Sequence, residues 1–248
     1  AKICPASSVF GAKINNCWDA TTLEDIYLPY KPKRQTRAEI AREKGLEGLA
    51  LWLMKQRHEP VQDKANIFIT DEVATADEAI KGASAIIAEW VNENARARQD
   101  VRKIFEKEAE ITSKVIKGKE EEGEKYKDYF DFAGLLSRCP SHRLLAIRRG
   151  EKEGILRVSI SPNDEHCINS LIQLYVKNSS QAADCVEAAV IDGYKRLMKP
   201  SIETEFANLS KDKADEEAIA VFAENLRQLL LAPPLGQKRV LAIDPGFR

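Results

Sequence analysis

Residues 75–91, TADEAIKGASAIIAEWV, decide the fold class of this chain. The first four have the spacing of a capping box, in which the Thr75 hydroxyl and the Glu78 carboxylate satisfy backbone N–H groups that a helix start leaves free. Apolar side chains then recur at three- and four-residue intervals: Ala79, Ala83, Ile86, Ile87, Trp90 and Val91. This broad apolar face predicts a helix packed into a protein core.

Helical signals continue toward the N-terminus of this run. A second capping box, Thr36 with Glu39, predicts a helix that Gly45 interrupts. Leu46, Leu49, Ala50 and Leu53 supply the apolar stripe of a following helix that ends near His58. Residues 60–71 are expected to form a connector. Before Pro32, the prolines and tyrosines favour an extended, proline-stiffened segment.

Five basic residues lie on the helix expected after Asn94: Arg96, Arg98, Arg102, Lys103 and Lys107. The favoured interpretation is a solvated face paired with Glu106, Glu108 and Glu110. The polar run KGKEEEGEKYK at 117–127 indicates a loop or a short exposed helix. Four aromatics at 126–132 could stack on bases, but docking against neighbouring helices is the favoured interpretation.

The second half of the chain is also expected to be mainly helical. A short helix follows Ser141 and closes at Gly150, and the alternation of residues 155–160 predicts a half-buried strand. Helices on either side of a turn at 178–181 should be antiparallel neighbours. Two more helices are expected, one from near Ser201 and one over 218–230. The run Arg239 to Asp244, followed by Pro-Gly, predicts a strand that begins a further domain.

These patterns together predict a mainly α fold: a multi-helix, bundle-like assembly with a short β element near 154–160 and a terminal strand near 239–244. Four regions follow from them. Residues 1–35 form the extended segment and residues 36–135 a helical region. Residues 136–237 form a second helical region with the short strand, and residues 238–248 form the first strand of a truncated domain.

Composition excludes several classes of protein. The chain is 44% apolar and 31% charged, and no stretch approaches the roughly 18 apolar residues that cross a bilayer. The first ten residues do not resemble a secretory signal, so we expect a cytoplasmic protein without a membrane partner. Five scattered cysteines without a Cys-x-x-Cys pair indicate reduced thiols and no metal site. The sequence suggests no cofactor.

The net charge of −1 is unevenly distributed. Residues 31–44 and residues 138–157 each contain six basic residues and two acids, whereas residues 201–231 contain seven acids and three basic residues. Two basic patches are therefore offset by acidic helices. A pI near 6.4 is compatible with a nucleic-acid partner but disfavours tight unassisted binding.

The basic patches contain the candidate nucleic-acid-binding residues. Lys31, Lys33, Arg34 and Arg37 lie on a stiffened loop beside a helix start, where cations and backbone donors could meet phosphates. The equally weighted alternative is a structural brace whose cations pair with acids of another domain. For Arg143, Arg148 and Arg149 the same two alternatives are open, phosphate contact or a structural role. For Arg143, a structural corner with His142 is slightly favoured.

Four blocks of the chain resemble the Tex family in sequence and in order. They are LEDIYLPYKPKR at 23–34, AREKGL at 41–46, PSHR at 140–143 with RGEKEG at 149–154, and VLAIDPGFR at 240–248. The first block is the most specific, and residues before about Trp18 match poorly. The resemblance implies a multidomain RNA- and DNA-binding protein linked to transcription. It also implies that a resolvase-like RNase H fold, helix-hairpin-helix modules and an OB fold follow this helical region.

The resemblance implies a nucleic-acid-binding fragment of a transcription accessory factor, with RNA or DNA and the transcription machinery as partners. The alternative is a helical scaffold or protein-interaction region that binds no nucleic acid. Asp244 has a catalytic precedent, since the first strand of RNase H-fold nucleases carries a metal-binding carboxylate. One carboxylate cannot perform two-metal chemistry. We therefore expect no enzymatic activity and no catalytic or metal-binding residues here. The oligomeric state stays open.

Overall fold

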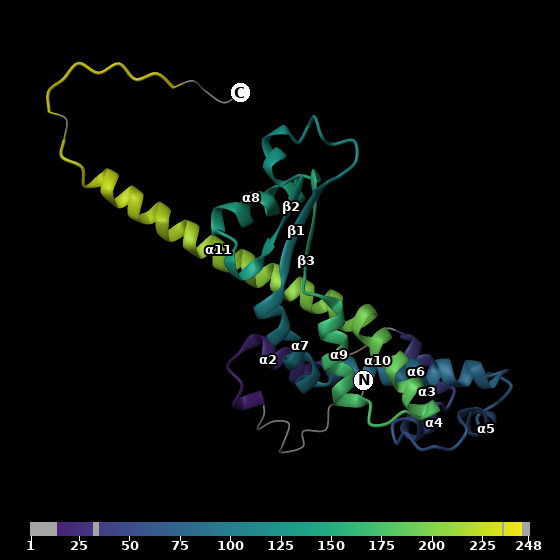
Figure 1. Cartoon of the computed structure of the whole chain (residues 1–248). Coiled ribbons are helices and arrows are strands. Elements are labelled where there is room, and N and C mark those ends of the chain that lie inside the picture. The colour runs from purple at the N-terminus through teal and green to yellow at the C-terminus, as the bar shows by residue number, and fades with distance from the viewer. Residues whose placement is uncertain (1–13, 32–34, 235, 245–248) are drawn as a thin grey trace.

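The computed structural model describes residues 14–31, 35–234 and 236–244 and is mainly helical, as expected (Figure 1). The helices are α2 (Ala20–Tyr27), α3 (Arg37–Glu43), α4 (Glu47–Leu53), α5 (Val61–Asn66), α6 (Ala76–Glu93), α7 (Ala95–Glu108), α8 (Ser141–Lys152), α9 (Asp164–Tyr175), α10 (Gln181–Gly193) and α11 (Lys199–Leu230). Short 3₁₀ turns lie at Leu28–Tyr30, Glu124–Tyr129 and Leu136–Arg138. The strands are β1 (Glu110–Val115), β2 (Asp131–Leu135) and β3 (Leu156–Ser161).

Helix α6 is the centre of the helical body. The Thr75 hydroxyl accepts a hydrogen bond of 3.2 Å from the Glu78 backbone N–H, which is half of the predicted capping box. The Glu78 carboxylate instead accepts from the N–H of Ala74 at 3.3 Å. The predicted apolar positions are buried, except that Trp90 is half-buried, and α3, α4, α5 and α10 pack around the helix. The prediction of a helix packed into the protein core is confirmed.

Helix α10 continues through one π-helical turn, Tyr194–Met198, into α11. A Cβ added to Gly193 would lie 2.8 Å from the carbonyl oxygen of Ala88, so glycine allows α10 and α6 to approach closely there. The prediction of two separate helices after Ser201 was wrong. No glycine or proline lies between Ser201 and Ala232 to end a helix, and the ion pair of Lys211 with Asp215 supports the polar stretch between the two expected helices.

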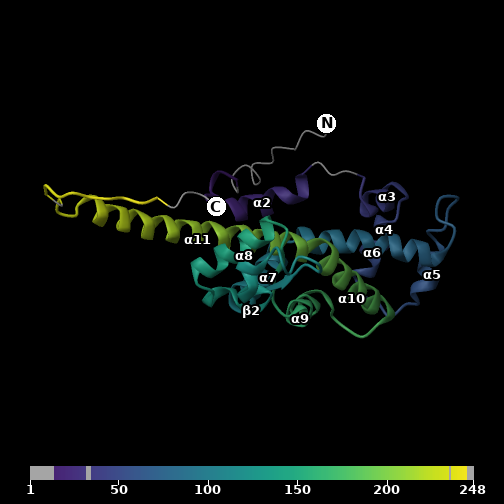
Figure 2. The ribbon, with the colours of Figure 1, turned by 90° about the horizontal axis from the view of Figure 1, so that it is seen from above.

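Helix α11 runs past the sheet and projects beyond the rest of the molecule (Figures 1 and 2). Its first half packs against α8 and β3, whereas every residue from Glu216 to Leu230 is exposed. Large apolar side chains on this outer half are among the most exposed in the molecule: Ile219, Val221, Phe222, Leu229 and Leu230. Within the described residues, no helix combines the length and apolar character that crossing a membrane requires.

The three strands form an antiparallel sheet in the order β2-β1-β3, with Ile111 opposite Gly134 and Ile160. Strand β3 agrees with the β element predicted near 154–160. Strands β1 and β2 were not predicted, because their pairing joins distant segments. The aromatic run contributes the 3₁₀ turn and β2, and Tyr126 packs on Ile155 and Leu156 rather than on helices alone.

Three local predictions need correction. Residues 20–27 of the segment expected to be extended form α2, which Asp19 caps by accepting from the Thr22 N–H at 2.7 Å. The expected connector contains α5. The strand expected over 239–244 is not formed: Val240, Leu241 and Ile243 are 69%, 87% and 82% exposed, and no strand among the described residues pairs with their backbone.

Candidate nucleic-acid interface

The outer face of α8 is a basic surface. Leu144, Ile147 and Gly150 face the core, so the opposite side of the helix is exposed to solvent. His142, Arg149 and Lys152 are exposed on that side, whereas Arg143 is exposed four residues before Ile147, over the ring of Phe132, and Arg138 is exposed in the preceding turn. We refer to these five exposed residues together as the α8 basic face. Within the described part of the chain, its arginines and lysine form no ion pair. From His142 to Lys152 the helix rises about 15 Å.

Acids near this face already have partners. Glu153 pairs with Lys125 at 2.8 Å, and its hydrogen bond with that ammonium lowers the pKa of the carboxyl. Glu151 pairs with Arg148 on the same helix. Glu153 also interacts electrostatically with Arg149, but because it is already paired with Lys125, the α8 basic face keeps a net positive charge that an anionic partner could meet.

The three α8 residues singled out from sequence have different surroundings. Arg143 lies over the Phe132 ring at 5.4 Å from the ring centroid, which positions the guanidinium while leaving the side chain exposed. Arg149 is exposed. Arg148 is half-buried and held by Glu151, so it belongs to the inner side of the helix. The sequence analysis missed Arg138 and Lys152, which the structure adds to this face.

The structure describes only part of the candidate basic loop at residues 31–37. Lys31 forms an exposed ion pair of 3.0 Å with Glu24 of its own segment, rather than with another domain. Lys33 and Arg34 lie outside the described residues. Arg37 begins α3, is exposed, and lies on the rim of a groove together with Lys44, Lys81 and Arg196. The sequence analysis did not bring these four cations together.

Two of the five basic residues expected on a solvated face of α7 lie in a buried ion-pair network, whereas Arg96, Lys103 and Lys107 are exposed as expected. Arg98 Nε donates to Asp25 at 2.7 Å, and Arg102 donates to both Asp25 and Glu205. Burial disfavours the charged guanidinium of Arg102, but its hydrogen bonds to these two carboxylates outweigh that effect and raise its pKa. The expected partners were wrong: the acids come from α2 and α11, and Glu108 pairs with His166 instead.

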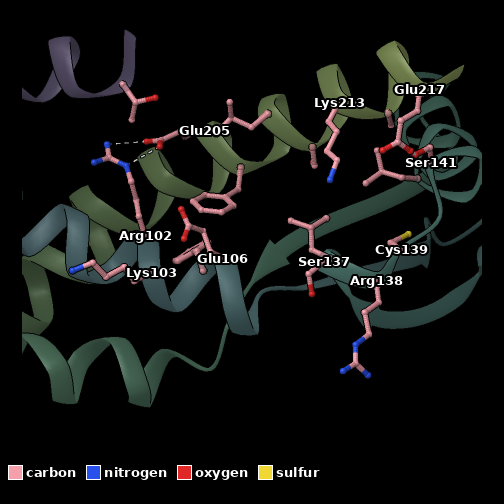
Figure 3. A pocket seen from close by; sticks show the side chains of 18 of the residues that line it. Arg102, Lys103, Glu106, Ser137, Arg138, Cys139, Ser141, Glu205, Lys213 and Glu217 are labelled. Atoms are coloured by element: carbon pink, nitrogen blue, oxygen red, sulfur yellow. Dashed lines mark hydrogen bonds and ion pairs between the residues drawn. The ribbon is translucent and has the colours of Figure 1, made fainter. Parts of the chain in front are cut away.

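A groove of about 860 Å³ lies beside this network, between α2, α7, α11 and the start of α8 (Figure 3). Its floor includes Phe105 and Phe206, whose ring centroids are 5.2 Å apart. Its charged lining residues are Arg102, Lys103, Arg138 and Lys213, with Asp19, Glu106, Glu205 and Glu217. In Figure 3 Lys213 points toward the groove and Arg138 away from it. Equal numbers of both signs give the groove no preference for a polyanion.

Within residues 14–31, 35–234 and 236–244, no three His, Cys, Asp or Glu side chains gather in a way that could hold a metal ion. Asp244, the residue with a catalytic precedent, lies in the exposed segment that follows α11. The α8 basic face is thus the strongest candidate for a functional surface.

Comparison with known proteins identifies a family and several relatives that this chain resembles. Residues 55–222 match the family described as Tex central region-like. YdcI of Bacillus subtilis, an uncharacterized protein, is 39% identical over 241 residues, which cover 95% of this chain and 34% of YdcI. The transcriptional accessory protein Tex of Neisseria gonorrhoeae is 38% identical over 250 residues, covering 96% of this chain and 32% of that protein.

A more distant relative is the human S1 RNA-binding domain-containing protein 1. It is 28% identical over 253 residues, covering 94% of this chain and 25% of the human protein. The chain spans about a third of the length of the bacterial relatives.

Proposed function

This chain belongs to the Tex family, and on that premise we propose that it is a non-catalytic, nucleic-acid-binding part of a cytoplasmic transcription accessory factor. The α8 basic face is the observation that carries the proposal. It offers exposed guanidinium and ammonium groups that form no ion pair with any acid among the described residues. Arginine binds phosphate oxygens through two parallel N–H groups, so this chemistry suits a phosphate backbone.

The length of the α8 basic face supports the same partner. Successive phosphates of one strand lie about 3.4 Å apart along a duplex axis, so a face of about 15 Å can follow about four of them. Contacts of this kind fix the position of a nucleic acid without reading its bases. We expect weak binding that is largely indifferent to sequence. The names of two relatives, a transcriptional accessory protein and an RNA-binding-domain protein, agree with this proposal.

A second candidate function is a scaffold that organises other domains or protein partners. The buried network favours it, because Arg98 and Arg102 are used to join α2, α7 and α11 and are not available to phosphate. The two candidates differ in one measurable property. Phosphate contacts release condensed counterions, so nucleic-acid affinity depends steeply on salt, whereas a scaffold shows no such affinity.

Fluorescence anisotropy with labelled single-stranded RNA, single-stranded DNA and duplex DNA tests the proposal over a range of salt concentrations. Three substitutions made together, Arg143→Gln, Arg149→Gln and Lys152→Gln, should reduce the slope of log affinity against log salt by about 2, for three contacts with a single strand. The loop variant with Lys33, Arg34 and Arg37 changed to Gln tests the other basic patch.

A matched control removes the same charge from three lysines elsewhere on the chain: Lys55→Gln, Lys64→Gln and Lys107→Gln. It should bind nearly as the parent does. If the α8 variant keeps the parental slope while the loop variant loses it, the binding surface is the loop. If the parent has no affinity for any of the three nucleic acids at low salt, the scaffold function replaces the proposal.

A further inference from the structure

A second groove, of about 500 Å³, lies between α3, α6 and α10 on the helical body. Small residues line its base: Gly82, Ser84 and Ala85 from α6, with Ala188 and Ala189 from α10. A Cβ added to Gly82 would lie 2.4 Å from Leu46 Cδ1, so glycine lets the chain at the end of α3 lie close to α6. We refer to this surface as the α3–α6–α10 groove.

The groove is wide and shallow at its base because its central residues are small. Ala188 is exposed, and Ser84 and Ala85 are half-buried, although all lie between packed helices. Ile40 contributes an apolar side chain that is 40% exposed, and Ile80 is half-buried. Small side chains at a helix contact allow the axes to approach to about 8 Å. An additional helix could therefore pack on α6 between α3 and α10.

The charges on the rim of the groove are unequal. Glu78 is held by Lys44 at 3.1 Å, and Asp192 accepts three hydrogen bonds from Arg196, two at 3.1 Å and one at 2.6 Å. Arg37 and Lys81 are exposed, and neither forms an ion pair within the described ranges. The hydrogen bond from Lys44 and, to a smaller extent, the charge of Lys81 lower the pKa of the Glu78 carboxyl. Four cations on the rim outnumber its two acids, so a positive charge remains beside the apolar base.

From this arrangement we infer that the α3–α6–α10 groove is a docking site for an acidic amphipathic helix of a protein partner. Small apolar residues of that helix would pack on Ala85 and Ala188, and carboxylates on its flanks would pair with Arg37 and Lys81. A helix presents such a pattern at three- and four-residue intervals. This protein-binding site is separate from the α8 basic face and does not depend on the proposed nucleic-acid function.

The same groove is poorly suited to nucleic acid. Binding of a phosphate backbone depends on the number of cations that replace condensed counterions, and only two unpaired cations are present among the described residues of the rim. Of the small residues at the base, Ser84 alone carries a side-chain hydrogen-bond donor for phosphate oxygens. Charge complementarity at the rim combined with a close-packing base is instead the pattern of a protein interface.

The test uses the whole chain and a labelled synthetic helical peptide of about 18 residues, or five turns, with alanine and leucine on one face and glutamate along both flanks. A second peptide with glutamine in place of glutamate is the ligand control. Anisotropy at low salt should show binding of the first peptide and at least tenfold weaker binding of the second. Circular dichroism of each protein variant verifies that its helical content matches the parent.

Two kinds of variant locate the binding. Arg37→Glu with Lys81→Glu should weaken binding of the acidic peptide at least tenfold, whereas the matched control Lys55→Glu with Lys107→Glu should not. Ala188→Trp fills the groove from an exposed position and should abolish binding, whereas Ala220→Trp on the projecting half of α11 should leave it unchanged. The triple glutamine variant of the α8 basic face should bind the peptide as the parent does.

Three results would overturn the inference. The acidic peptide could fail to bind the parent, or bind equally well to the Ala188→Trp and charge-reversed variants. Alternatively, the charge-reversed variant could lose affinity for single-stranded RNA while peptide binding stays unchanged, which would assign Arg37 and Lys81 to the nucleic-acid surface. If only the α8 variant loses RNA binding, that result bears on the proposed nucleic-acid function and does not contradict the docking site.

Discussion

Asp25 and Arg98 are 73 residues apart in the sequence, yet the carboxylate accepts a hydrogen bond of 2.7 Å from the guanidinium in the interior of the protein. Their side chains are 6% and 5% exposed. Arg102, one turn further along α7, donates to the same carboxylate and to Glu205. One acid of α2 therefore fixes that helix to α7, and α11 joins through the same two arginines.

Replacing Asp25 by alanine should strongly destabilise the protein. The change leaves two buried or half-buried guanidinium groups with too few acceptors, a type of defect that costs about 3 to 5 kcal/mol. The thermal midpoint should fall by roughly 6 to 20 °C for a chain of this size. Asp128→Ala, at an exposed position of the same charge, should change it by less than about 2 °C. Equal midpoints for the two variants would contradict this account.

Gly193→Ala should lower the free energy of unfolding, although alanine normally favours a helix. The new methyl group would lie 2.8 Å from the carbonyl oxygen of Ala88, and backbone atoms cannot move aside cheaply. Overpacking of this kind costs about 1 to 3 kcal/mol. Gly48→Ala is the control, since its methyl group would meet only the Phe68 side chain, at 3.2 Å. Urea unfolding of both variants provides the comparison, and a stabilised Gly193→Ala would refute the close approach.

Tyr175 should make the protein sensitive to alkaline pH. Burial raises the pKa of its phenol to about 12, compared with about 10 in an unfolded chain. The neutral phenol is favoured in the fold, so its contribution to stability is complete below about pH 10 and is lost as the pH rises toward about 12. Tyr175→Phe should shift alkaline unfolding, followed by circular dichroism, to higher pH. Unchanged alkaline unfolding would exclude this phenol as a cause.

The same substitution should cost little at neutral pH. The Tyr175 hydroxyl is buried and has no hydrogen-bond partner among the residues that the structure describes. Removing a buried polar group without a partner is close to neutral or slightly stabilising, within about 1 kcal/mol. A loss of more than about 2 kcal/mol at neutral pH would show that the hydroxyl has a partner.

The chain should not cleave nucleic acid in the presence of magnesium or manganese. Two-metal hydrolysis requires several carboxylates held around the cations, and Asp244 lies on an exposed segment without companion acids gathered for that purpose among the described residues. Incubation of labelled single- and double-stranded substrates with either metal is the measurement. Cleavage by the parent that disappears in Asp244→Asn would overturn the expectation.

Removing residues 238–248 should leave the thermal midpoint nearly unchanged. Residues 239–244 form no strand, and their apolar side chains are exposed, so their removal loses little packing. Differential scanning calorimetry of the shortened chain beside the parent provides the measurement. A fall of more than about 8 °C would mean that this segment is integral to the core.

Local sequence patterns predicted helices and turns well where the residues that form the pattern are the same few residues that form the structure. The Thr75 cap, the α6 face and the turn between α9 and α10 are examples. Strands β1 and β2 could not be found in this way, because Ile111 pairs with Gly134 and Ile160 from distant segments. The continuity of α11 was missed because a polar stretch was taken as a helix end, although it contains no residue that ends helices.

The site residues show the same difference between local patterns, which the sequence reveals, and contacts between distant segments, which it does not. The sequence located basic residues on α8 but did not separate Arg148 from the exposed cations. Glu151, three residues after Arg148, was a usable signal, since residues three apart are neighbours on a helix and these two form an ion pair. No comparable signal linked Asp25 to Arg98 and Arg102. Buried ion pairs between distant segments follow from tertiary packing, which charge counting along the chain does not describe.

The two halves of α11 should differ in how well their amide hydrogens resist exchange with solvent deuterium. Residues 199–214 pack against the body and should exchange only through large openings of the fold. From Glu216 to Leu230 every residue is exposed, and the hydrogen bond that Glu217 accepts from Ser141 lies at the inner end of this stretch. About 15 residues of helix alone are marginally stable in water. Because the packed half supplies the helical nucleus, fraying should begin at Leu230 and advance inward, giving a graded loss of protection along one uninterrupted helix.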